Sequence, residues 1–433
     1  MLGQFRDEIG LQSRLTREYG DTFRYKVGPF RVTVANHPDA IEQVLVSKSR
    51  NFKKDPFYEQ MKRILGEGLL TSEGEFHKLQ RRLIQPIFHH SLIKEYGQEM
   101  VEFGGRYRER WHDGQTFDLH QELMQLTLAV VGKTLFGADV ERDAADVGEA
   151  LGTILGVFDE PALFLLIFFS GPAARLIERV PLPAVRRFQR AVEQLDALIF
   201  RLIAEKRAAG AGGSDLLSRL LHAQEEGSGM SDQQVRDEAI TIFLAGHETT
   251  AVALTWTFYL LARHTQVEEK LHAELDEVLG DRLPTVEDLD RLSYTRKVLS
   301  ESMRLYPPAW EIGRQALSDV EINGYLIPEG SSVLMSQFVV HRDPRWFPDP
   351  RRFDPERWDP EEEAKRPRYS YFPFGGGSRI CIGESFAWME GILLLATLAQ
   401  RWRLRLVPGH RVALDPKITL RPKYGMRMTV AGR

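Results

Sequence analysis

The segment 372–383, FPFGGGSRICIG, constrains this chain more than any other because it holds Cys381, the only cysteine among 433 residues. A single thiol excludes an internal disulfide and a zinc or iron–sulfur site made of four cysteines. The three consecutive glycines at 375–377 permit positive φ and let the backbone lie close to a flat ligand. An apolar run with helical character follows at 385–398. Cys381 is therefore expected beside a helix N-terminus, where backbone N–H groups and the helix dipole favour a thiolate.

Three interpretations of this cysteine have different functional consequences. A lone cysteine is commonly a small apolar residue of the core. A glycine-rich loop can instead cradle phosphate, but no Gly-Lys-Ser/Thr sequence follows these glycines. A thiolate at a helix N-terminus can also ligate heme iron and donate electron density that favours cleavage of dioxygen.

A second stretch whose residues could take part in catalysis is the long helical pattern of 231–263. Ala245 and Gly246 give it a small face on which a bulky group can lie against the backbone. Glu248 and Thr249 follow, and a buried acid beside a hydroxyl can relay protons to a reduced oxygen species. Thr249 can also bond to a carbonyl one turn earlier and open the helix locally.

These motifs resemble those of the cytochrome P450 monooxygenases. The residues AGHETT at 245–250 match the family pattern [AG]Gx[DE]T[TS], and a helical ExxR and a downstream PER segment follow in the family's order. Five positions of the cysteine loop match FxxGxRxCxG, namely Phe374, Gly377, Arg379, Cys381 and Gly383.

The resemblance implies a role for each matching residue. Cys381 would be the axial ligand of the iron in heme b (iron protoporphyrin IX). Thr249 would hydrogen-bond the bound oxygen and Glu248 would supply protons, whereas His247 is interpreted as structural. His77 and Arg81, one helical turn apart, would bind the propionates, although such a pair is otherwise usually solvated. The residues expected to contact the heme are His77, Arg81, Ala245, Arg314, Phe374, Arg379 and Gly383.

Other residues are expected to support the fold or contact the substrate. Glu301 and Arg304 lie three apart on a predicted helix and would pair at the surface for little gain, or be buried with further partners. The resemblance implies a buried scaffold that includes Arg357. The apolar cluster within 156–180 is interpreted as a buried helix end or loop or, compatibly, as the lid of an apolar substrate channel in which Phe158, Phe164, Phe168 and Phe169 would meet the ligand. The expected substrate pocket comprises Leu69, Leu70, Phe168, Ala309, Trp310, Ile312 and Leu420.

The implied fold is mainly α with small β-sheets (α+β), with heme between the long central helix and the cysteine loop. A single domain over 1–433 would contain a β-rich lobe from about 20–50 and 312–340, and a helical lobe at 75–310 and 374–400, without a fused reductase. Hydrophobic periodicity predicts helices and strands, whereas 57–74 reads as irregular. The predicted helices are 8–19, 75–89, 96–111, 118–136, 189–206, 231–263, 266–279 and 294–305, and strands are predicted within 22–35, 310–340 and 402–433.

Composition limits the partners. A net charge of −4 gives no basic field for nucleic acid. No apolar run reaches the roughly 20 residues that span a bilayer, and neither a signal peptide nor the family's N-terminal anchor is evident. We therefore expect a monomeric, cytoplasmic protein of the soluble bacterial type. Electrons from NAD(P)H would arrive through a separate reductase and an acidic ferredoxin or flavodoxin, docking near Arg81, Arg82 and 365–368.

The leading hypothesis is a heme-thiolate monooxygenase that inserts one atom of O2 into a C–H or C=C bond of an apolar substrate. A peroxide-driven peroxygenase is a rival, but that branch replaces the acid–threonine pair, which is intact here. A non-catalytic heme or lipid carrier would not need the pair. Among substrates we expect a long-chain fatty acid, whose carboxylate Lys62 or Arg63 could bind. A terpenoid, a steroid or a polyketide is the alternative.

Overall fold

The structure is a computed structural model that describes residues 8–28, 30–88, 90–137, 148, 150, 152–154, 156, 183–208, 210, 215–225 and 230–433. The expected lid segment with Phe158, Phe164, Phe168 and Phe169 lies outside the described residues. The chain forms two compact units. The first comprises Met1–Pro56, Met100–Leu123 and Thr249–Arg433, and the second comprises Phe57–Glu99 and Met124–Glu248. The helices after Thr249 thus belong to the same unit as the sheet described next, and the expected two-lobe division stays a prediction.

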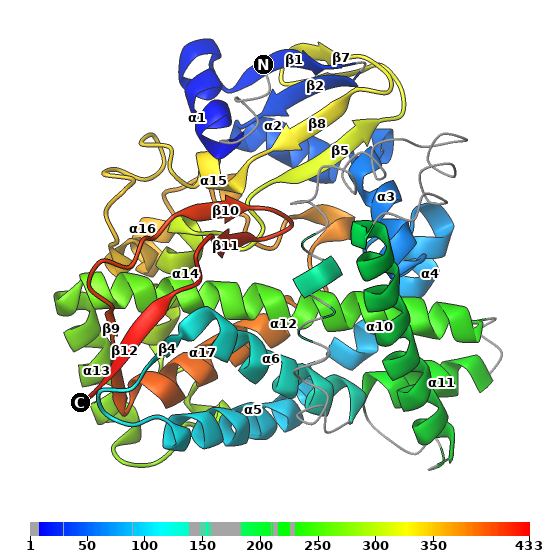
Figure 1. The fold of residues 1–433 in the computed structure, drawn as a ribbon. Coiled ribbons are helices and arrows are strands. Elements are labelled where there is room, and N and C mark those ends of the chain that lie inside the picture. Colours follow the sequence, from blue (N-terminus) through cyan, green and yellow to red (C-terminus); the bar gives the residue numbers. More distant parts are fainter. Residues whose placement is uncertain are drawn as a thin grey trace. The chain divides into compact units, whose positions relative to one another are not determined.

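The largest sheet of the first unit has five strands in the order β1-β2-β8-β5-β3 (Figure 1). Strands β1 (Thr22–Val27) and β2 (Phe30–Ala35) form the predicted antiparallel hairpin. β8 (Ser332–Met335) runs parallel to β2 and antiparallel to β5 (Ile312–Ala316). β5 in turn pairs with β3 (Phe52–Lys54). The two predicted strand regions, almost 300 residues apart in the sequence, therefore build one sheet.

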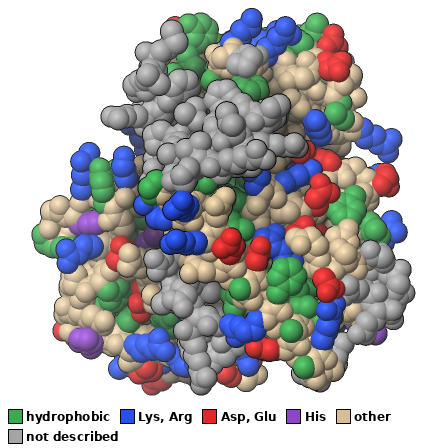
Figure 2. All heavy atoms as spheres, turned by 45° about the vertical axis from the view of Figure 1, so that its right-hand side comes forward, with side chains coloured by type: hydrophobic (Ala, Val, Ile, Leu, Met, Phe, Trp, Pro, Cys, Tyr) green, Lys and Arg blue, Asp and Glu red, His purple; other side chains and the backbone are tan. Residues whose placement is uncertain are grey.

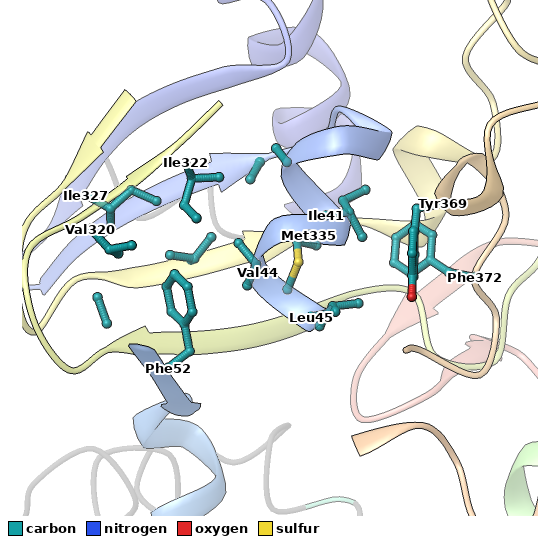
Figure 3. Packing of buried hydrophobic residues seen from close by; sticks show 14 of the residues in the cluster. Ile41, Val44, Leu45, Phe52, Val320, Ile322, Ile327, Met335, Tyr369 and Phe372 are labelled. Atoms are coloured by element: carbon teal, nitrogen blue, oxygen red, sulfur yellow. The ribbon is translucent and has the colours of Figure 1, made fainter. Parts of the chain in front are cut away.

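A short helical segment covers this sheet and forms its core (Figure 3). α2 (Pro38–Glu42) begins at Pro38 because proline suits the first helical turn, and the side chain of His37 caps it by accepting from the N–H of Asp39. The π-helix η2 (Gln43–Ser47) continues it. The shared cluster is buried and ends at the cysteine loop. It includes Ile41, Val44, Leu45, Phe52, Val320, Ile322, Ile327, Met335, Tyr369 and Phe372.

The remaining strands form small sheets in the same unit. β6 (Val320–Ile322) and β7 (Tyr325–Ile327) are joined by Asn323 and Gly324, whose φ values of 49° and 81° suit a two-residue hairpin turn. The others are β4 (Thr116–Asp118), β9 (Trp402–Leu406), β10 (Leu414–Pro416), β11 (Leu420–Pro422) and β12 (Arg427–Gly432), paired as β4-β12-β9 and β10-β11.

The helices follow the predicted pattern with one correction. The segment expected to be irregular contains α3 (Pro56–Leu65), which buries Met61, Ile64 and Leu65 on one side. The prediction missed it because one buried face over ten residues is a weak periodic signal. The other main helices are α1 (Glu8–Tyr19), α4 (Gly74–Ile84), α5 (His90–Arg110), α6 (Leu119–Phe136), α10 (Pro183–Ala208), α11 (Leu216–Glu225), α12 (Asp232–Arg263), α13 (Thr265–Leu279), α14 (Ser293–Leu305) and α17 (Glu384–Ala399).

A buried ion pair on α14 organises the irregular segment 341–358. Arg304 donates two hydrogen bonds to the carboxylate of Glu301, both 2.8 Å long, and both side chains are fully buried. Glu301 also accepts from the indole of Trp358 and the N–H of Asp354, each at 3.0 Å. Arg357 lies 3.4 Å from the same carboxylate. The pair is therefore buried with further partners, which excludes the surface alternative.

The guanidinium of Arg304 satisfies three backbone carbonyls as well. It donates to the oxygens of His341 and Pro350 at 2.8 Å and to that of Arg352 at 3.1 Å. Each of its N–H donors thus has an acceptor, as a buried charge requires.

Two surface features bear on possible partners, namely membrane-spanning helices among the described residues and the charge on the face seen in Figure 2. Each described helix is too short or too polar to cross a bilayer. Figure 2 shows Lys and Arg side chains interspersed with Asp and Glu on the visible face, as the net charge of −4 suggests.

We predict that Arg304→Ala destabilises the protein by about 3–5 kcal/mol, because it leaves the Glu301 carboxylate buried without its cation. Lys297 on the same helix pairs with Asp359 in a more exposed setting, so Lys297→Ala should cost less than about 1 kcal/mol. Urea unfolding of both variants measures the difference. Equal losses would contradict this account of the pair.

Candidate functional site

Cys381 lies at the surface of the first unit, just before α17. Its thiol is exposed, which excludes the interpretation as a core residue. The N–H of Cys381 donates to the carbonyl of Phe374 at 3.0 Å, so the loop is closed on itself. Helix α17 begins at Glu384 with Gly383 as its N-cap. The thiol is therefore placed near the free N–H groups of a helix start, as the sequence predicted.

The glycines of the loop are required by its close contacts. Gly377 has a φ of 65°, and a Cβ there would lie 1.9 Å from the carbonyl oxygen of Leu45. A Cβ on Gly376 would lie 2.7 Å from the ring of Tyr369. Both contacts anchor the loop to the core cluster shown in Figure 3. The backbone of Leu45 and the side chain of Tyr369 thus leave room only for glycine at 377 and 376.

The middle of α12 has an open face. Ala245 is exposed and Thr249, one turn later, is half-buried, whereas Glu248 is 3% exposed. The otherwise largely buried middle of the helix is therefore uncovered at Ala245, where the sequence analysis placed a bulky group against the backbone. The helix is continuous from Asp232 to Arg263, so the expected local opening of its backbone at Thr249 is not seen.

His247 is part of the framework of the second unit. It is buried, and its Nδ1 lies 2.9 Å from the carbonyl oxygen of Phe243. Thr127 donates to the carbonyl of His247, also at 2.9 Å. Burial lowers the pKa of His247 to about 4. The ring is neutral at pH 7 and donates from Nδ1, in agreement with the structural interpretation.

The basic residues expected to contact the heme are divided between the units. Arg314 on β5 and Arg379 at the end of η9 (Gly377–Arg379) are half-buried in the unit that holds Cys381. His77 and Arg81 lie one turn apart on α4 in the second unit. His77 is only 4% exposed, so the alternative of a solvated pair does not hold for it.

The expected pocket residues have different surroundings. Trp310 and Leu420 are buried together in one apolar cluster with Ile9 and Phe338. The indole of Trp310 donates to the carbonyl of Lys417 at 2.8 Å. These two residues are therefore core residues of the first unit, and their contact with a substrate stays a prediction.

Ile312 and Ala309 are only partly buried. The Cδ1 atom of Ile312 lies 3.3 Å from where a Cβ of Gly375 would stand, so Ile312 adjoins the cysteine loop. Leu69 and Leu70 belong to the second unit, where Leu69 is 8% exposed and Leu70 half-buried.

Glu390 is an ionisable residue of the first unit that the sequence analysis missed. It lies on α17, is fully buried, and desolvation raises its pKa to about 8. The hydroxyl of Thr250, the neighbour of Thr249 on α12, acts in the opposite direction. The available signal was a single acid inside the apolar run 385–398.

A flat prosthetic group with a metal centre fits the residues around Cys381. The exposed thiol supplies one soft ligand at a helix start, glycines let the backbone come close, and Arg314 and Arg379 supply cations for carboxylates. Phe374 packs beside Trp388, with ring centroids 5.7 Å apart, and gives the loop an aromatic side.

Comparison with known proteins agrees with this fit. Residues 2–427 match the family model described as cytochrome P450, and the chain belongs to that family. It is 41% identical to cyclooctatin synthase of Streptomyces melanosporofaciens, over 93% of this chain and 87% of the relative. It is 36% identical to pentalenene oxygenase of Streptomyces avermitilis, over 96% and 91%.

A solved structure shows the same fold. The heme domain of cytochrome P450DA aligns with a TM-score of 0.87 at 27% identity, covering 99% of this chain and 93% of that one. The predicted P450 fold is therefore confirmed. The protein is a cytochrome P450 monooxygenase whose cofactor is heme, and its reaction requires O2 and electrons from redox partners.

We predict that Glu390→Gln becomes stabilising as pH rises. The ordinary pKa of 4.5 is raised to about 8 in the folded protein. Between these values the unfolded state ionises and the folded state does not, so wild-type stability falls by about 1.4 kcal/mol per pH unit from this group. Denaturant unfolding at pH 5, 6.5 and 8 should show a growing advantage of the variant. A difference that does not change with pH would contradict the assignment, and the exposed Glu361→Gln is the control.

Proposed function

We propose that this monooxygenase oxidises a terpenoid by hydroxylation or epoxidation. The observation that carries the proposal is its similarity to terpenoid-oxidising enzymes. Pentalenene oxygenase is one of them. Cyclooctat-9-en-7-ol 5-monooxygenase of Streptomyces melanosporofaciens is another, 40% identical over 90% of this chain and 84% of the relative. These relatives favour the terpenoid alternative over the fatty acid expected from the sequence.

The surroundings of Lys62 agree with this change of substrate class. Its ammonium group lies 3.1 Å from carboxylate oxygens of both Glu59 and Glu67. One of the two cations that could have bound a fatty-acid carboxylate, Lys62, is therefore already paired within the chain. A neutral cyclic hydrocarbon or alcohol needs no such cation, and apolar contact suffices for it.

Each site residue has a defined task in this proposal. The bound heme supplies the oxygen-activating chemistry. Cys381 would hold the iron as thiolate, and Arg314 and Arg379 would bind carboxylates of the cofactor, as would His77 and Arg81. Thr249 donates a hydrogen bond on the open face of α12, and the buried Glu248 beside it moves protons toward that face.

The intact acid–threonine pair favours a monooxygenase over the two alternatives. A peroxide-driven enzyme does not need proton delivery to reduced oxygen, and neither does a carrier.

We further propose a ferredoxin or flavodoxin as electron donor. Arg82 on α4 is exposed and is a plausible contact for an acidic partner. The expected contribution of 365–368 is weaker, because Lys365 pairs with Glu362 at 2.5 Å and the exposed Glu361 and Glu363 lie nearby.

An optical titration of the ferric protein tests the substrate class. Cyclic terpene hydrocarbons and alcohols should shift the Soret band to shorter wavelength in a saturable manner, since they displace water from the iron. C12 to C18 fatty acids should bind at least about tenfold more weakly, a difference of about 1.4 kcal/mol. Saturable shifts with fatty acids alone would overturn the terpenoid proposal.

The task of Thr249 is tested by Thr249→Ala. We expect product formed per NAD(P)H consumed to fall about tenfold or more, because a positioned proton donor contributes at least that much, while hydrogen peroxide rises. Thr249→Ser keeps the hydroxyl and should retain most of the coupling. Full coupling in the alanine variant would exclude this role.

A further inference from the structure

Two neighbouring carboxylates at the start of α12 hold a loop of the second unit. Asp237 accepts a hydrogen bond from the backbone N–H of Glu67 at 2.8 Å. Glu238 accepts one from the N–H of Leu69 at 2.9 Å. Asp237 is 5% exposed and Glu238 is fully buried. Buried hydrogen bonds to ionised acceptors are among the stronger contacts in proteins.

The loop, residues 66–72, is packed directly against α12. A Cβ on Gly66 would lie 2.1 Å from the carboxylate of Asp237. A Cβ on Gly68 would lie 2.2 Å from Oγ1 of Thr241 and 2.5 Å from the carbonyl of Asp237. The glycines at 66 and 68 are thus required by the approach of the backbone to the helix.

The loop is also closed within itself. The hydroxyl of Thr71 donates to the carbonyls of Gly66 and Gly68 at 2.7 and 3.1 Å. The N–H groups of Thr71 and Ser72 both donate to Gly68 at 2.9 Å. A loop built in this way moves as one piece, and its position depends on the contacts to Asp237 and Glu238.

One of the two carboxylates, that of Asp237, is also connected to α10. Arg236, 4% exposed, donates to Asp237 at 3.0 Å and also to Asp196 of α10, with its Nε 2.7 Å away. Gln233 donates to the same oxygen of Asp237 at 2.9 Å. One network therefore joins α10, α12 and the loop, and it partly compensates the buried negative charge.

We infer that Asp237 and Glu238 are positioning residues that fix the loop 66–72 on α12 and thereby set where Leu69 and Leu70 meet the substrate. The inference rests on the proposed function in one respect, that these leucines face the substrate. Arg236 would transmit displacements of α10 to the loop, so that access to the pocket and the shape of its wall change together.

The test is the double variant Asp237→Asn/Glu238→Gln in the heme-loaded protein. Asp232→Asn is the matched control, because Asp232 is an acid of the same helix that pairs with Arg207. The first readout is hydrogen exchange of the amides of Glu67 and Leu69. We expect it to be about tenfold to hundredfold faster in the double variant and unchanged in the control. Unchanged exchange in the double variant would overturn the inference that the two acids fix the loop.

The second readout is the position of oxidation on a terpenoid substrate and the rate at which that substrate dissociates. A broader product distribution and faster dissociation are expected. Faster exchange with an unaltered product distribution and dissociation rate would overturn the positioning role.

If no terpenoid binds, the proposed function fails but the inference can still be tested. A bulky aryl azole that ligates ferric heme then replaces the substrate. Its association should then be faster in the double variant, while association of cyanide is unchanged. Equal azole rates would overturn the inference.

If the double variant does not fold, Gly68→Ala takes its place. The added Cβ on the loop would clash with Thr241 and with the carbonyl of Asp237, and would thus push the loop away from α12 while both acids are kept. It should reproduce the faster exchange and the altered products or azole rates. Wild-type behaviour in this folded variant would count against the inference.

Discussion

The compensation of one buried charge holds much of the first unit together. Arg304 cannot stay inside without directing every donor at an acceptor, and it uses Glu301 and three carbonyls to do so. One carbonyl belongs to His341, whose Nε2 accepts from the N–H of Phe372 at 3.0 Å. Phe372 opens the cysteine loop. The ion pair is thus two hydrogen bonds away from the segment that carries Cys381.

The protonation state of His341 makes this connection work. It is completely buried, and desolvation lowers its pKa well below the usual value. The neutral ring keeps a lone pair on Nε2 for Phe372, which a protonated ring would not have. The loop is held from the other side by Gly377 against Leu45. The thiol can therefore be exposed while the backbone that carries it is firmly packed.

Many helices and the cysteine loop could be predicted from the sequence, because the patterns that specify them are local. Periodicity over ten or more residues predicted α1, α12 and α17, and the five spaced residues around Cys381 predicted the loop. The contacts between distant segments could not be predicted in this way. That Gly377 meets Leu45, or that Glu238 meets Leu69, depends on tertiary packing, which local patterns do not record. Glu390 was overlooked for the same reason, since only its surroundings make it unusual.

The three parts of α12 show how one helix combines separate tasks. At its start, Asp237 and Glu238 hold a loop by its backbone. In its middle, small residues and Thr249 leave an open face. Near its end, Trp256 donates to the carbonyl of Leu420 at 2.7 Å and stacks on Tyr306 with centroids 4.3 Å apart. The helix thus has distinct partners along its length, the loop 66–72 at its start and Leu420 and Tyr306 near its end. Because each turn is hydrogen-bonded to the next, these contacts and the residues between them are carried on one continuous element from Asp232 to Arg263.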